Sequence, residues 1–212
     1  MLVVVVAVPV VLTMTLVRLL TFPWYPAWQY RRAGFPADPY GLPRQERLRL
    51  ASATIRFLNI PGQTDILETL ELPDGSPAYN DRELHHMDDV KAVYNGLSVA
   101  ALGFLIAGAV SGWALWRAQG APALWIALTR GATLTLALLV TLGAWMLLGF
   151  DRFFTAFHGV FFEPGTWVFY YTDTLIRLFP IEFWQTAGLL VAGGVTLLSL
   201  LLIALGRRMR LS

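Results

Sequence analysis

The sequence predicts an all-α integral membrane protein with four transmembrane helices. The chain of 212 residues is 56% hydrophobic and only 14% charged, whereas an average soluble domain is about a quarter charged. Its apolar residues gather in four long stretches, each close to the length of about 20 residues with which a helix crosses a bilayer. The chain contains no cysteine, which excludes disulfide frameworks, thiolate nucleophiles and Cys-held zinc or iron–sulfur sites.

Each predicted span has its own composition. The first, residues 1–22, is rich in Val, Leu and Thr. Bulky residues follow it instead of a small-residue cleavage site, so we expect a retained helix rather than a signal peptide. The second, 92–117, is rich in Gly and Ala, which suits close helix packing in lipid. The third covers 131–150, and the fourth, 186–206, ends before the arginines of the tail 207–212.

The distribution of charge predicts the orientation of these spans. The connection 118–130 and the tail 207–212 contain arginines and no acid, whereas all 14 acidic residues fall within 23–91 and 151–185. Cytoplasmic loops of membrane proteins carry an excess of Lys and Arg. We therefore expect both termini in the cytoplasm and the two longer segments on the extracytoplasmic side, one between helices 1 and 2 and the other between helices 3 and 4.

The first outer segment, 23–91, has the composition of a soluble protein and opens with aromatic residues of the kind found at headgroup level. Apolar residues at helical spacing predict a helix over about 44–58. Asn80 followed three residues later by Glu83 predicts a capping box. No proline follows before the second span ends, so one helix is expected from about 81 to 116. The rest should form short strands or turns.

The second outer segment, 151–185, is aromatic, but charged residues, glycine and proline interrupt it and exclude a continuous span. A stripe of phenylalanines at helical spacing also contains His158; its members are Phe154, Phe157, Phe161 and Phe162. This pattern predicts an amphipathic helix lying at the membrane interface. After a turn at 163–165, a second interfacial piece is expected over 167–179.

The three histidines are the groups best suited to acid–base chemistry, and all lie in the outer segments. In a helix Asp89 lies one turn beyond His86, where it can accept an imidazole N–H and fix the tautomer. His85 bears the same relation to Asp88 and Asp89, so spacing does not choose between the two. The alternative for this stretch is a solvated helix start with acids near the positive end of the helix dipole. For His158 the alternative is a hydrogen-bonded histidine in an aromatic interface.

Histidines from two distant segments favour an acid–base pair or, together with Asp88 or Asp89, a metal site. The chain has no HExxH, GxSxG or glycine-rich phosphate loop, so nucleophilic catalysis by the protein is not expected. Arg18, Arg152 and Arg177 flank the outer boundary, where contact with phospholipid phosphates is expected. If one of them faces the histidines, it can stabilise an oxyanion.

Two motifs connect these histidines to a known family. Residues 86–91 read His-Met-Asp-Asp-Val-Lys, and residues 157–162 read Phe-His-Gly-Val-Phe-Phe. With the stretch 178–184 and the four spans, these motifs make the chain resemble the lipoprotein intramolecular transacylases, a bacterial family of small integral membrane proteins. The likeness covers nearly the whole chain and assigns the motif histidine to His86, with His85 as an extra neighbour.

The resemblance implies a reaction at the outer face of the bacterial cytoplasmic membrane. The family moves the sn-2 acyl chain of a lipoprotein's S-diacylglyceryl cysteine to the α-amino group of the same cysteine, giving the lyso form. It implies the diacylglyceryl lipoprotein and membrane phospholipid as partners, with no nucleic acid, cofactor or metal. It makes His86 and His158 the catalytic pair. Asp89, Met87 and Arg177 become candidates for support, by orienting a histidine or stabilising an oxyanion.

Such a transfer needs no nucleophile from the enzyme, because the substrate's own amine attacks. It needs a base for the amine proton, an acid for the departing glycerol oxygen and enforced proximity, and neutral histidines suit both proton roles near pH 7. One alternative is a metal-dependent membrane hydrolase or lipase that uses His85, His86, Asp89 and His158. Another is a non-enzymatic accessory protein of the membrane whose histidines only pack.

Overall fold

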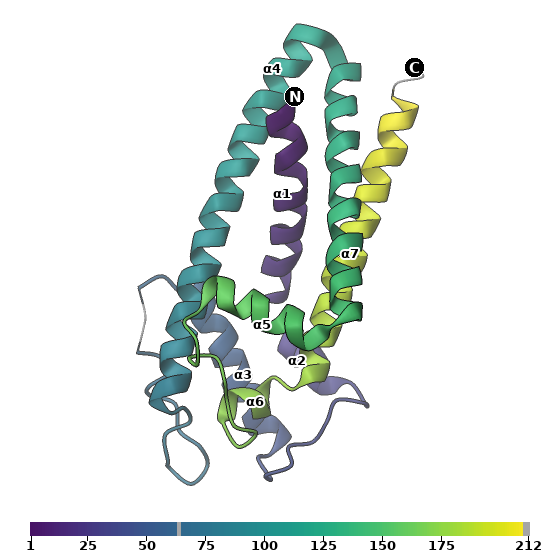
Figure 1. Cartoon of the computed structure of the whole chain (residues 1–212). Coiled ribbons are helices and arrows are strands. Elements are labelled where there is room, and N and C mark those ends of the chain that lie inside the picture. The colour runs from purple at the N-terminus through teal and green to yellow at the C-terminus, as the bar shows by residue number, and fades with distance from the viewer. Residues whose placement is uncertain (63–64, 210–212) are drawn as a thin grey trace. The chain divides into compact units, whose positions relative to one another are not determined.

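The computed structural model of the chain describes residues 1–62 and 65–209, and these residues confirm the predicted all-α class. The described part contains no extended strand, and a single antiparallel bridge joins Glu71 to Pro77. The helices, labelled in Figure 1, are α1 (Leu2–Leu20), α2 (Trp24–Arg31), α3 (Arg44–Asn59), α4 (Asp81–Leu148), α5 (Phe150–Phe161), α6 (Thr174–Leu178) and α7 (Ile181–Arg208).

Three helices, α1, α4 and α7, are long and apolar enough to cross a membrane. The helix α4 consists of two arms that meet at Gly120, where the chain reverses (Figure 1). The φ of Gly120 is 82°, a left-handed conformation that glycine adopts without a steric penalty. The connection expected over 118–130 is therefore far shorter than predicted, because every residue in it except Gly120 belongs to a helix.

Residues 1–17 and 96–155 form one compact unit with the part of α7 that begins at residue 189. Small residues let the helices of this unit approach closely. A Cβ atom added at Gly131 would lie 2.7 Å from the Cβ of Val8, and one at Gly108 would lie 2.9 Å from the Cβ of Ala7. The helix α1 therefore packs against both arms of α4 at glycines, and small residues are common at helix contacts in membranes.

Residues 18–95 and 156–188 form the second unit. The predicted helix over 44–58 is confirmed as α3, and a helix that the sequence did not predict, α2, contains the aromatic cluster. Tyr25 and Tyr30 of α2 are each only 1% exposed. Their hydroxyls donate hydrogen bonds to the backbone carbonyls of Phe183 and Leu178, at 2.7 and 2.8 Å. The polar tips thus find partners although the rings are buried.

The predicted capping box at the start of α4 is confirmed. The backbone N–H of Asn80 donates to Glu83 Oε2 at 2.9 Å, and the N–H of Glu83 donates to Asn80 Oδ1 at 3.1 Å. The other oxygen, Glu83 Oε1, accepts the backbone N–H of Leu175 at 2.7 Å. This carboxylate, only 1% exposed, therefore caps α4 and ties it to α6. Burial raises the pKa of Glu83, against the hydrogen bonds from Asn80 and Leu175.

The second outer segment forms the predicted helix in its first half and mostly turns in its second half. A helix, α5, forms over the phenylalanine stripe, and its apolar side is open, with Phe157 48% and Val160 75% exposed. The piece expected at the interface over 167–179 forms a run of turns followed by α6. Leu175 and Leu178 of α6 are buried. This short helix therefore packs into the second unit through its apolar residues.

Candidate active site

The structure brings His86 of α4 and His158 of α5 together within the second unit. The ring of Phe162 lies against both, with centroid distances of 5.1 Å to His86 and 5.7 Å to His158. The charge of His158 also lowers the pKa of His86, so the two imidazoles interact electrostatically. Two histidines from distant segments thus share one site, as an acid–base pair requires.

Aromatic rings enclose this pair. Phe169 meets His86 edge-on at 5.1 Å, and Trp167 lies 4.7 Å from His158 with its plane tilted by 34°. We call Phe162, Trp167 and Phe169 the aromatic enclosure. The Nδ1 atom of His86 is buried and has no hydrogen-bond partner in the structure. Because unpaired buried polar atoms are costly and rare, this nitrogen is a natural contact for a reacting group.

Burial gives His86 the protonation state that acid–base chemistry at neutral pH requires. Burial lowers the pKa of this imidazole to about 4, and the charges of His158 and His85 act in the same direction, while the Asp89 carboxylate opposes them. Desolvation penalises the charged form of an imidazole. His86 is therefore neutral at pH 7, and its ring can accept a proton there.

Asp89 lies beside the other histidine of the motif. Its Oδ2 atom is 3.7 Å from His85 Nε2, and the His85 side chain is 64% exposed. Toward His86, Asp89 acts through its charge, which raises the pKa of that ring. A role of Asp89 in orienting His86 therefore stays a prediction, now with His85 as a competing neighbour. Met87 is buried at 6% exposure and belongs to the core of the unit.

Arg177 is engaged in a structural ion pair. Its Nε and Nη2 atoms donate to the two oxygens of Asp38 at 3.1 and 2.9 Å, and its backbone carbonyl accepts a hydrogen bond from Arg47 Nε at 3.0 Å. Burial raises the pKa of Asp38, but the hydrogen bonds from Arg177 and Leu42 outweigh it and hold that pKa below its usual range. The pairing raises the pKa of Arg177. The loop around Asp38 is thereby anchored to α6.

Sequence reasoning missed a second ion pair that borders the site. Arg82 Nη2 lies 2.6 Å from Asp173 Oδ2, and the Arg82 guanidinium lies 5.6 Å from the ring centre of Phe169 and 4.9 Å from that of Tyr170. Arg82 precedes His86 by four residues, the spacing at which side chains share one face of a helix. That spacing is the signal by which Arg82 could have been found.

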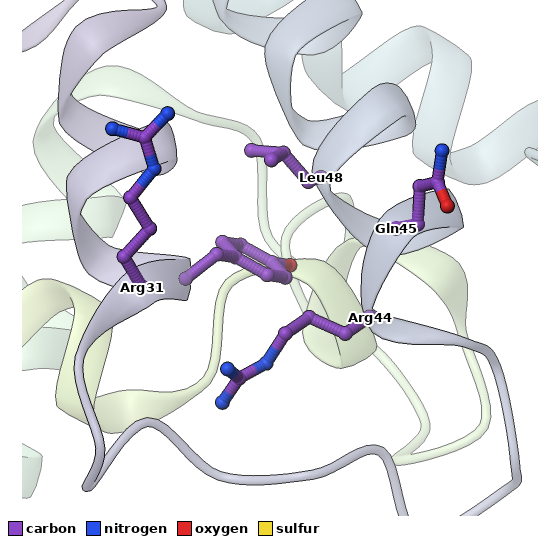
Figure 2. Close-up of a pocket in the computed structure, with 5 residues that line it drawn as sticks. Arg31, Arg44, Gln45 and Leu48 are labelled. Atoms are coloured by element: carbon purple, nitrogen blue, oxygen red, sulfur yellow. The ribbon is translucent and has the colours of Figure 1, made fainter.

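An open hollow of about 440 Å³ lies elsewhere in the second unit. Figure 2 shows the side chains of Arg31 and Arg44 around it, together with Gln45 and Leu48. Tyr30 completes the lining, so no histidine contributes to it. Its guanidinium groups make it a basic surface feature separate from the site built around His86.

Comparison with known proteins identifies the family. A family model described as lipoprotein intramolecular transacylase Lit matches residues 1–184. The chain belongs to the lipoprotein intramolecular transacylase family. It is therefore a membrane acyltransferase of lipoprotein maturation, as the resemblance predicted.

One relative and two solved structures are similar to the chain. The transacylase chain is 32% identical over 167 residues to an uncharacterized protein of Aquifex aeolicus (strain VF5), a match that spans 78% of this chain and 73% of the relative. The fold of this chain is similar to that of the membrane integral lipoprotein intramolecular transacylase Lit from Bacillus cereus. The TM-score is 0.77 at 21% identity, over 100% of this chain and 96% of that one. A structure of the same Bacillus protein with a histidine substituted gives a TM-score of 0.75 at 21% identity, over 100% and 94% of the two chains.

The metal-dependent alternative lacks a preformed ligand set in the described residues of the transacylase. Within residues 1–62 and 65–209, no three His, Asp or Glu side chains gather closely enough to hold a metal ion. His85 and Asp89 meet each other, whereas His86 and His158 face aromatic rings. Both imidazoles of the site therefore contact the aromatic enclosure.

Proposed function

We propose that this transacylase moves the sn-2 acyl chain of a diacylglyceryl lipoprotein to the α-amino group of the lipid-bearing cysteine. His86 and His158 then act as its general acid and base. The observation that carries this proposal is the shared enclosure, in which both imidazoles contact Phe162 and Nδ1 of His86 has no partner. A paired acid and base with an open proton-accepting position is what an ester-to-amide transfer requires.

The reaction balances within the substrate and the two imidazoles. The amine nitrogen attacks the ester carbonyl, a C–N bond forms, and the C–O bond to glycerol breaks. One histidine takes the proton that the amine loses, and a proton returns to the departing glycerol oxygen. His86, with its pKa lowered to about 4, is neutral before the transfer. Once protonated it is a strong acid toward an alkoxide, which suits the second step.

The aromatic enclosure supports this chemistry in two ways. Phe162, Trp167 and Phe169 surround the imidazoles with apolar surface, which limits the access of water that would hydrolyse the ester. Holding amine and ester of one molecule in contact also supplies a large part of the acceleration, since the attack becomes intramolecular. The outer face of α5, open at Phe157 and Val160, offers apolar surface to an acyl chain.

We infer a four-span topology for the transacylase, with α1, the two arms of α4 and α7 crossing the membrane. Gly120 at the reversal of α4 then lies on the cytoplasmic side, with Arg117 and Arg130 near it and Arg207 and Arg208 at the end of α7. Arg210, the remaining arginine of the expected inner face, lies outside the described residues. The acidic residues and all histidines then lie on the outer side, where the lipid-modified cysteine is found.

Mass spectrometry of lipoprotein N-termini tests the proposed function. The gene is expressed in a bacterial host that makes only the diacyl form. The lyso form should appear with the parent chain and be lost with His86→Ala or His158→Ala. His85→Ala is the matched control, because this neighbouring side chain is exposed and should retain activity. Unchanged diacyl lipoprotein in cells that contain the inserted parent protein refutes the proposal.

A further inference from the structure

We propose that Arg82 and Asp173 are positioning residues for the transfer, whose ion pair holds the aromatic rings of residues 163–173 against the two histidines. We call this segment, which connects α5 to α6, the aromatic flap. The inference rests on the proposed role of His86 and His158 and adds two residues that touch neither the reacting amine nor the ester.

Asp173 attaches the flap to the helix that carries His86. Its Oδ2 atom lies 2.6 Å from Arg82 Nη2, and its Oδ1 atom accepts a hydrogen bond from Asn80 Nδ2 at 3.2 Å. The backbone N–H of Tyr170 also donates to Asp173 Oδ2, at 2.8 Å. The Asp173 side chain is only 10% exposed. Two residues at the start of α4 thus bind the same carboxylate, one turn before His86.

The flap covers both histidines with the rings that it carries. Trp167 lies 4.7 Å from His158, and Phe169 lies 5.1 Å from His86. The Arg82 guanidinium lies 5.6 Å from the ring centre of Phe169, within the range of a cation–π contact. Phe169 therefore contacts Arg82 and His86, whose i,i+4 spacing places both on one face of α4. The position of Arg82 thereby fixes the position of the ring that covers His86.

Little regular structure holds the flap by itself. Its residues form turns between α5 and α6, and Val168, Tyr170 and Tyr171 are 56%, 68% and 82% exposed. A segment with exposed side chains and no ladder of backbone hydrogen bonds depends on its few anchors. The ion pair with Arg82 joins the end of the flap to α4, so its loss should free Phe169 and Trp167 to move away from the imidazoles.

Movement of the flap should change the pKa of His86 in the opposite direction to a simple loss of the Asp173 charge. Burial is the main cause that lowers the pKa of His86, and the titratable groups that act on it are His158 on α5 and His85 and Asp89 on α4. Removing the negative charge of Asp173 would, by Coulomb's law alone, lower that pKa further. If Asp173→Asn opens the flap and admits water, the pKa should rise instead.

The experiment titrates the histidines of isotope-labelled, full-length protein in lipid nanodiscs by NMR and measures lyso-lipoprotein formation with the same variants. In Asp173→Asn and Arg82→Gln we expect the pKa of His86 to rise by about one unit or more and transfer to fall by about tenfold. The double variant should be no worse than either single one, because the pair acts as one anchor. Arg82→Lys, which keeps the charge, should recover most of the transfer activity that Arg82→Gln loses. That recovery would show that a substitution at position 82 leaves the fold intact.

Glu46→Gln serves as the matched control, since it breaks an exposed ion pair with Arg49 on α3 and should change neither readout. An unchanged or lowered pKa of His86 in Asp173→Asn overturns the proposal, whatever Arg82→Gln does, because loss of the Arg82 charge alone already raises that pKa. So does a raised pKa accompanied by parental activity, because the pair would then be structural only. The titration needs no turnover, so a parent chain that forms no lyso lipoprotein refutes the proposed function without altering what the titration says about the flap.

Discussion

The imidazole rings of His86 and His158 both lie against the ring of Phe162, at centroid distances of 5.1 and 5.7 Å. One phenylalanine therefore helps to set the spacing of both imidazoles. Because His86 comes from α4 and His158 from α5, this spacing depends on side-chain packing and not on the geometry of one helix. The site should consequently be sensitive to the volume of the residue at position 162.

Phe162→Leu should reduce formation of the lyso form by about tenfold or more, since small misplacements of catalytic groups cost large factors in rate. Leucine is apolar but lacks the flat ring that contacts both imidazoles. The measurement is the fraction of lyso lipoprotein at equal amounts of membrane-inserted protein. Phe154→Leu, at a residue of α5 that is 39% exposed, is the control and should stay close to the parent. Equal activity of the two variants contradicts the role given to Phe162.

The buried state of His86 predicts a pH dependence of stability. Its folded pKa of about 4 lies below the value of about 6.5 in an unfolded chain, so between these values the unfolded state binds more protons. The free energy of unfolding therefore rises with pH across this window and falls as the solution is acidified. The difference between the unfolding temperatures measured at about pH 4.5 and about pH 7 should be smaller for His86→Gln than for the parent.

His85→Gln controls for this measurement because the His85 side chain is 64% exposed. It should keep the pH dependence of the parent. If His86→Gln behaves like His85→Gln, the burial of His86 does not govern acid stability.

Asp89→Asn should lower activity by weakening the base character of the site. The Asp89 charge raises the pKa of His86, so removing it makes an already weak base weaker still. The variant should fold, because the carboxylate is partly solvent-accessible and lies 3.7 Å from the exposed His85. Comparison with His85→Ala in the lipoprotein assay separates the two routes. Loss of activity in Asp89→Asn with activity retained in His85→Ala would show that Asp89 does not act through His85. Activity of Asp89→Asn within a few-fold of the parent removes it from the site.

The ion pair between Arg177 and Asp38 predicts a loss of stability when one partner is removed. Arg177→Met leaves the Asp38 side chain, which is 0% exposed, without its counter-charge. The expected cost is about 3–5 kcal/mol in the free energy of unfolding, toward the lower end because 13% of the Arg177 side chain stays in contact with solvent. Chemical denaturation in detergent measures it, and Arg177→Met combined with Asp38→Asn should recover part of the loss. Reduced transfer with unchanged stability would instead return Arg177 to the oxyanion role.

Local patterns in the sequence predicted the elements that depend on neighbouring residues. The capping box of Asn80 and Glu83 fixed the start of α4, and helical spacing of apolar residues predicted α3, because both signals act within a few residues. The long apolar stretches predicted the helices α1, α4 and α7, which dominate the composition.

Features that depend on distant residues could not be predicted in this way. The partner of Arg177 is Asp38 and the partner of Arg82 is Asp173, and no periodicity links residues so far apart along the chain. The choice of Asp89 between His85 and His86 was left open by spacing, because both lie within one turn. Two histidines in distant outer segments favoured an acid–base pair, and the family motifs assigned it to His86 and His158. Spacing along the chain could not show the contact itself, since it requires the packing of α4 and α5.

The close packing of α1 on α4 predicts that a larger residue at Gly131 destabilises the membrane helices. A Cβ atom at Gly131 would lie 2.7 Å from the Cβ of Val8 and 2.9 Å from the backbone oxygen of Val5. Because backbone cannot move aside as a flexible side chain does, Gly131→Ala should destabilise the protein by about 1–3 kcal/mol. Gly143→Ala lies on the same arm with nothing within 4 Å of its Cβ, and alanine's higher helix propensity should make it neutral or slightly stabilising. Unfolding of both variants in detergent compares them directly. A stable Gly131→Ala protein would mean that α1 does not pack on α4 in the membrane as it does here, and that the helix contacts around Val8 rearrange in lipid.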